Sequence, residues 1–107
     1  MISFSDWKKA ELKVARIVSA EEIEGKDKLY RLGISLGGEE RQIVAGLKPF
    51  YGKDELVGKS IVVVANLEPA KIAGIESQAM LLAACNQDGD YRLVSVDSSV
   101  EPGALVE

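Results

Sequence analysis

The chain has 107 residues, of which 47% are hydrophobic and 28% are charged, as expected for one globular domain at residues 1–107. It contains no histidine and a single cysteine, which excludes a Ser–His hydrolytic triad, a structural zinc site and an internal disulfide. We therefore expect a protein that is not an enzyme and that holds no metal or other cofactor.

The charges are unevenly distributed along the chain. The formal net charge is −4, which taken alone argues against a nucleic-acid partner. Residues 1–59, however, carry 11 basic and 10 acidic side chains, whereas residues 60–107 carry 2 and 7. The first half can thus supply a local basic face for phosphates. No apolar run is long enough to span a membrane and no secretory signal is recognisable, so we expect a cytoplasmic protein without membrane contact.

The expected elements start with a short N-terminal helix. Ser5 or Asp6 is a suitable helix cap, and Phe4 and Trp7 would pack that helix onto the domain. Alternating or continuous apolar residues then predict five strands, with one helical turn at residues 53–56 before the fourth. The five strands are expected at residues 12–18, 29–36, 41–45, 60–65 and 79–84.

Further turn signals lie in the C-terminal part of the chain. Residues 87–90, Gln-Asp-Gly-Asp, are typical of a hairpin turn leading into a strand at residues 91–96, and residues 102–106 predict an edge strand. Cys85 ends an apolar run and is expected to be a small buried side chain. Several short strands at regular spacing favour an all-β barrel or sandwich.

Two polar segments flank the end of the fourth predicted strand. Asn66 leaves that strand, and Ser77, Gln78 and Met80 precede the next one, so these side chains are expected at one end of the sheet. Asn, Ser and Gln can hydrogen-bond base edges or a 2′-hydroxyl, and Met offers an apolar surface to an unstacked base. The alternative is that Asn66 ends a strand and Ser77-Gln78 forms an ordinary turn.

Five sequence blocks occur in an order typical of a known family. They are Lys28-Leu29-Tyr30, Arg41-Gln42-Ile43-Val44-Ala45-Gly46, Leu56-Val57-Gly58-Lys59, Val64-Ala65-Asn66-Leu67-Glu68-Pro69 and the run from Gly74 to Ala83. Together they resemble the tRNA-binding domain family, which includes the C-terminal extension of methionyl-tRNA synthetases. The opening Phe4-Ser5-Asp6-Trp7-Lys8-Lys9 is most similar to that extension or to its separate β subunit.

The resemblance implies a five-stranded OB-fold barrel with a short N-terminal helix and a peripheral helical turn. It also implies a homodimer, which the apolar residues Val94, Val96, Val100, Leu105 and Val106 support. Two departures from the family pattern bear on tRNA affinity rather than on the fold. The segment Ala70-Lys71-Ile72-Ala73 lacks the extra basic residues found in many members, and Ala79 replaces a glycine.

Two functions from different classes follow. The first is a tRNA-binding module that serves a synthetase catalytic chain and recognises tRNA by shape and phosphate contacts. Its predicted contacts are Lys13, Arg16, Lys28, Arg41, Lys48 and Lys71 for phosphates, with Asn66, Ser77, Gln78 and Met80 in the groove. The second is a dimerisation or protein-docking module, similar to export chaperones that bind peptides, with weak RNA binding.

Overall fold

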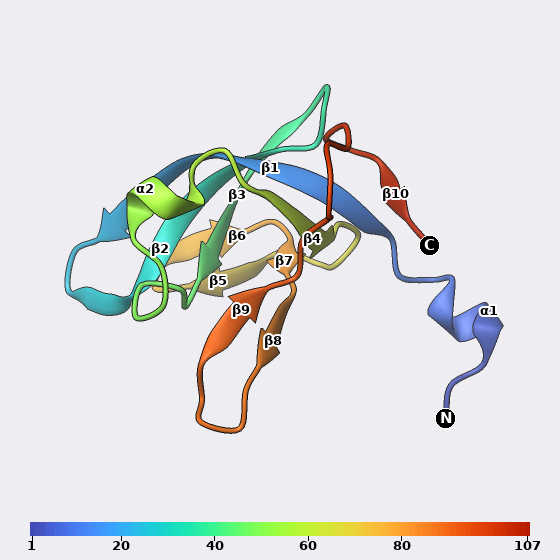
Figure 1. The fold of residues 1–107 in the computed structure, drawn as a ribbon, viewed down its shortest axis with the longest axis horizontal. Coiled ribbons are helices and arrows are strands. Elements are labelled where there is room, and N and C mark those ends of the chain that lie inside the picture. The colour runs from blue at the N-terminus through green and yellow to red at the C-terminus, as the bar shows by residue number, and fades with distance from the viewer.

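The computed structural model describes residues 1–107 and is mostly β (Figure 1). Its main sheet has the order β3-β2-β1-β4-β7, and β10 also pairs with β1. These strands are β1 (Leu12–Ile23), β2 (Lys26–Ser35), β3 (Glu40–Ala45), β4 (Ser60–Val64), β7 (Met80–Leu81) and β10 (Leu105–Val106). All their pairings are antiparallel. The expected all-β OB barrel with a five-strand path is confirmed.

Strand β1 connects the two sides of the barrel. Its first half, Leu12 to Arg16, pairs with β4, and its second half pairs with β2 from Arg16 onward. The register shifts between Ile17 and Ser19, as at a β-bulge, and such a shift bends the strand and increases its twist. One continuous strand can therefore curve through both sides of a small barrel. This explains why β1 continues to Ile23, five residues beyond its expected end at residue 18.

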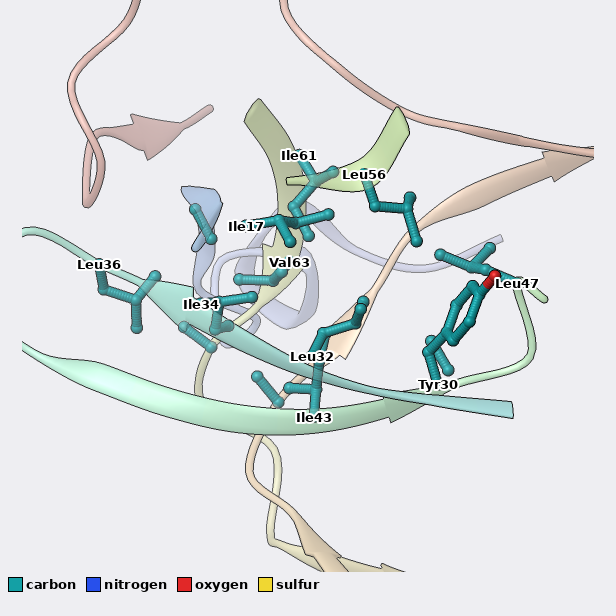
Figure 2. Packing of buried hydrophobic residues seen from close by; sticks show 14 residues of the cluster. Ile17, Tyr30, Leu32, Ile34, Leu36, Ile43, Leu47, Leu56, Ile61 and Val63 are labelled. Atoms are coloured by element: carbon teal, nitrogen blue, oxygen red, sulfur yellow. The ribbon is translucent and has the colours of Figure 1, made fainter. Parts of the chain in front are cut away.

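The core is formed by alternate residues of β1 to β4 that point into the barrel (Figure 2). Ile17, Leu32, Ile34, Ile61 and Val63 have no exposed surface. Helix α2 (Lys53–Leu56), the predicted helical turn, adds Leu56, which is also fully buried. The Glu55 carboxylate accepts a hydrogen bond from the Gly52 backbone N–H (2.8 Å), which stabilises the start of this turn.

Two small hairpins lie outside the main sheet. The first joins β5 (Ala70–Ile72) to β6 (Ile75–Ser77), and the second joins β8 (Ala83–Cys85) to β9 (Tyr91–Leu93). The first turns at Ala73 and Gly74, which both have positive φ (53° and 78°), as a tight two-residue hairpin turn requires. Neither β5 nor β6 was an expected strand.

Other expectations were wrong at the edges of the fold. Helix α1 (Phe4–Trp7) is capped by the Ser3 hydroxyl, which accepts the Asp6 N–H (3.0 Å), rather than by Ser5 or Asp6. Phe4 and Trp7 do not join either hydrophobic cluster of the barrel, and they are 73% and 43% exposed. The helix lies away from the barrel, on the side of the C-terminus, and a short connection leads from it into β1 (Figure 1).

The apolar run at residues 79–84 is also not one strand. It divides into β7, which pairs with β4, and β8, which pairs with β9. The change of partner occurs at Leu82: its N–H still donates to the Val62 carbonyl (3.0 Å), but its carbonyl accepts the Val94 N–H (3.0 Å). Cys85 is consequently in the outer hairpin and is exposed, not buried. The strands expected at residues 91–96 and 102–106 are shorter, at Tyr91–Leu93 and Leu105–Val106. Both helices have only four residues, too few to cross a membrane.

Candidate nucleic-acid interface

The outer wall formed by β2 and β3 is the surface that OB folds use for oligonucleotides. It is flanked by the β1–β2 turn at Gly25 and by residues 66–78, a segment that we call the arm and that contains β5 and β6. Because Leu32 and Ile43 point into the core, the alternate residues Arg31 and Gln42 face outward on this wall. The wall and its two flanks form the candidate interface.

The arm is attached to β3 largely by side-chain hydrogen bonds. The Ser77 hydroxyl accepts the Val44 N–H (3.0 Å) and donates to the Ala79 carbonyl (3.3 Å). Gln78 accepts the Gln42 N–H on its side-chain oxygen (2.9 Å), and its own N–H donates to the Gln42 carbonyl (2.9 Å). Both predicted groove residues thus have bonds within the protein that sequence reasoning had not indicated.

Asn66, at the start of the arm, also bonds to a distant segment of the chain. Its side-chain oxygen accepts the Glu11 N–H (2.8 Å), and its amide nitrogen donates to the Lys9 carbonyl (2.7 Å). Both partners belong to the connection between α1 and β1. Asn66 therefore holds the N-terminal connection against the beginning of the arm.

Two of the predicted phosphate contacts are engaged in ion pairs. Lys48 lies 2.5 Å from a Glu22 carboxylate oxygen, and this hydrogen bond lowers the pKa of Glu22 and raises the pKa of Lys48. Arg41 pairs with Glu39 (2.8 Å) and also donates to two backbone carbonyls. Glu22 belongs to β1, so the sequence could not assign it to Lys48, whereas Glu39 is only two positions before Arg41.

The other four predicted cations have no carboxylate within salt-bridge distance. Lys28 follows the β1–β2 turn and Lys71 lies on the arm, so these two flank the β2–β3 wall. Arg16 lies opposite Ser35 of β2 and faces outward, whereas Lys13 is on the other face of β1. The structure also adds Lys26, an exposed lysine without a carboxylate partner at the first position of β2, which the sequence-based predictions lacked.

An apolar groove lies between the arm and the β8–β9 hairpin. Its volume is about 610 Å³, and the end of β3 forms part of its lining. Met80 and Tyr91, which are 50% and 42% exposed, are among its lining residues, as are Leu67 and Ile72 of the arm. The charged lining residue is Glu68. The groove, which we call the arm groove, thus contains the predicted Met80 together with the buried Ser77.

Residues 12–105 match the family model described as "Putative tRNA binding domain". The methionine-tRNA ligase of Thermotoga maritima is 53% identical over 105 residues, which are 98% of this chain but 16% of the ligase. The ligase of Thermococcus onnurineus is 46% identical, again over 98% of this chain and 14% of the ligase. The chain thus spans about a sixth of the length of these relatives.

Solved structures share the whole fold. A methionyl-tRNA synthetase related protein from Pyrococcus horikoshii superposes with a TM-score of 0.94 at 37% identity, covering 100% of this chain and 98% of that chain. The chaperone CsaA from Bacillus anthracis gives a TM-score of 0.91 at 27% identity, covering 100% and 99%. With almost its entire length matched by the family model and by close relatives, the chain belongs to the tRNA-binding domain family.

Proposed function

We propose that this domain is a non-catalytic module of a methionyl-tRNA synthetase that binds tRNA on the β2–β3 wall. The observation that carries the proposal is the placement of unpaired lysines on both flanks of this wall, with Lys26 and Lys28 near the β1–β2 turn and Lys71 on the arm. Their partners would be backbone phosphates, so that binding depends on the shape of the tRNA rather than on its base sequence.

Arg16 extends the proposed footprint. Its outward position opposite Ser35 lets a tRNA that crosses the wall from β3 to β1 reach it. The proposed cellular setting is the cytoplasm, where a synthetase catalytic chain would share the tRNA. In this arrangement Met80, exposed in the arm groove, offers an apolar surface to an unpaired base next to the wall.

A salt titration of tRNA binding tests the proposal. Each phosphate contact contributes about −0.9 to the slope of log K against log salt on duplex nucleic acid, so three lysine contacts and Arg16 together predict a slope of about −3 to −4. Lys28→Ala and Lys71→Ala should each reduce that slope by about one. Lys8→Ala is the matched control and should leave the slope unchanged, because Lys8 is an exposed lysine without a carboxylate partner at the end of α1, away from the wall. A slope near zero would refute phosphate-based binding.

A second candidate function is peptide docking in the arm groove. The observation that favours it is the apolar lining of the groove, in which the charged side chain is the acidic Glu68 rather than a cation. An extended apolar peptide with a basic residue fits this chemistry. Peptide binding that persists at high salt, combined with a flat salt dependence for tRNA, would favour this candidate over the first.

We also propose that the domain forms a homodimer through its terminal segments. Phe4, Trp7 and Leu105 are 73%, 43% and 62% exposed, and all three line a hollow of about 450 Å³ between α1 and β10. Exposed apolar side chains gathered in this way are typical of an interface. Light scattering should give a dimer mass for the wild type and a monomer mass for a Trp7→Ala/Leu105→Ala variant. A wild-type monomer at all micromolar concentrations would contradict the proposal.

A further inference from the structure

Arg41 joins the two ends of the arm. Its Nη1 atom donates to the Ala65 carbonyl (2.6 Å) and to the Gln78 carbonyl (3.2 Å). Ala65 immediately precedes the arm, and Gln78 is its last residue. One guanidinium group from β3 therefore closes the base of a long excursion of the chain, although the two carbonyls are 13 positions apart in the sequence.

The guanidinium group is itself held by Glu39. The Arg41 Nε and Nη2 atoms donate to the two Glu39 carboxylate oxygens (2.8 and 3.3 Å), and this bidentate contact is the main reason that the pKa of Glu39 is lowered. The Arg41 side chain is 21% exposed. An arginine has five N–H donors, and here four hydrogen bonds to the protein use most of that capacity.

The remaining attachments of the arm to β3 are few. Gln78 and Gln42 share two hydrogen bonds, Ser77 accepts the Val44 N–H, and the Gln42 side chain donates to the Glu76 carbonyl (3.1 Å). No strand pairing joins β6 to β3. The orientation of the arm consequently depends on a small set of side chains, while the barrel keeps its own backbone ladders.

We propose that Arg41 is a positioning residue for tRNA binding, which acts by clamping the base of the arm rather than by contacting a phosphate. The inference rests on the proposed tRNA-binding function, because the arm carries Lys71 and provides Leu67 and Ile72 to the wall of the arm groove. With the clamp intact, these side chains stay in a fixed position beside the β2–β3 wall. Without it, the arm moves and its contacts with RNA weaken together.

Arg41→Lys separates the clamp from a phosphate contact. Lysine keeps the positive charge, but its single ammonium group lacks the planar fork that reaches two carbonyls and a carboxylate at once. The clamp predicts that Arg41→Lys and Arg41→Ala weaken tRNA binding alike, by about tenfold, and that both lower the salt slope by the same amount, up to the contribution of about 0.9 from Lys71 on the arm. A phosphate contact predicts that Arg41→Lys binds like the wild type and that Arg41→Ala reduces the slope by about 0.9. That second pattern would overturn the proposal.

Amide hydrogen exchange tests the clamp without RNA. The clamp predicts that the Gln42, Val44 and Gln78 amides exchange about tenfold faster in Arg41→Lys, while the Leu32 amide inside the barrel is unaffected. Arg92→Lys is the matched control, because Arg92 also pairs with a carboxylate, Asp90 (3.1 Å), but lies outside the arm. Wild-type exchange at all three amides in Arg41→Lys would overturn the clamp.

The tRNA-binding and hydrogen-exchange measurements test separate claims. Absence of wild-type tRNA binding would refute the proposed function, whereas the exchange rates of Arg41→Lys would still decide whether the clamp exists. If Arg41→Ala does not fold, Arg41→Lys supplies both the binding and the exchange comparison. Faster exchange at the arm with wild-type tRNA affinity would overturn the positioning role, because the arm would then be loosened without consequence for binding.

Discussion

Replacing Ser77 by alanine should destabilise the domain before it affects any ligand. The side chain is 6% exposed, and its hydroxyl is the acceptor for the N–H of Val44, which is itself 8% exposed. Alanine fits the space but leaves this buried donor without a partner. An unsatisfied buried N–H costs about 1–3 kcal/mol, and each kcal/mol lowers Tm by roughly 4–8 °C in a domain of this size.

Thermal unfolding followed by circular dichroism measures this effect, with urea unfolding at 25 °C as a second estimate. Ser98→Ala is the matched control, since Ser98 is exposed and its hydroxyl has no partner in the structure, so this variant should unfold like the wild type. If Ser77→Ala also unfolds at the wild-type temperature, the Ser77 hydroxyl does not attach the arm to β3. A loss of tRNA affinity in that stable variant would then favour direct contact with RNA.

Three further predictions concern other parts of the fold. Leu56→Ala should lower the free energy of unfolding, measured with urea, by about 2–5 kcal/mol, because removing a fully buried side chain leaves a cavity in the core. A loss smaller than about 2 kcal/mol would mean that α2 moves in to fill the cavity. Glu22 has a pKa below its ordinary value of 4.5 because of Lys48, so its ion pair stabilises the fold above that value and is lost as the pH falls through the lowered pKa. Glu22→Gln should therefore lose less stability than the wild type on acidification, and parallel pH profiles would contradict the pairing. Asn66→Asp keeps the acceptor for Glu11 but loses the donor to Lys9, so limited proteolysis should cut near α1 faster with the barrel intact, whereas unchanged cleavage would contradict this role.

The barrel strands were predictable because their patterns are long and local. Residues 61–65 form a continuous apolar run, and residues 29–36 alternate between buried and partly exposed positions, which fixes their faces. The helical turn at residues 53–56 follows from its polar residues and the glycine after it. Such signals do not depend on the partner strand. The observed boundaries of β2, β3 and β4 therefore lie within one or two residues of the expected ones, except that β2 starts earlier, at Lys26.

The arm could not be predicted from the same signals. Its strands have three residues each, too few for a periodic pattern, and one of its two positive-φ positions is Ala73 rather than glycine. The hydrogen bonds that define Ser77, Gln78 and Asn66 connect residues 33 to 57 positions apart. The side-chain types and the family resemblance indicate these residues in the sequence, but their partners depend on tertiary contacts.

The lysines predicted as phosphate contacts were likewise predictable only in part. Lys28 and Lys71 were predicted as phosphate contacts and lie on the flanks of the β2–β3 wall, without a carboxylate partner. Lys48 was predicted on the same grounds, but β1 brings Glu22 next to it. Charge counting along a chain indicates how many cations are available. It does not indicate which of them are neutralised by a residue from another strand.

The location of the tRNA site is tested most directly by chemical-shift mapping of the ¹⁵N-labelled domain with unlabelled tRNA. Binding on the β2–β3 wall predicts that the largest changes fall on the amides of the β1–β2 turn, on outward residues of β2 and β3 such as Arg31 and Gln42, and on the arm around Lys71. Amides of α2 and of the β8–β9 turn should change least. Shifts confined to α1 and β10, or the absence of any shift at tRNA concentrations in the micromolar range, would contradict the assignment of the β2–β3 wall as the site.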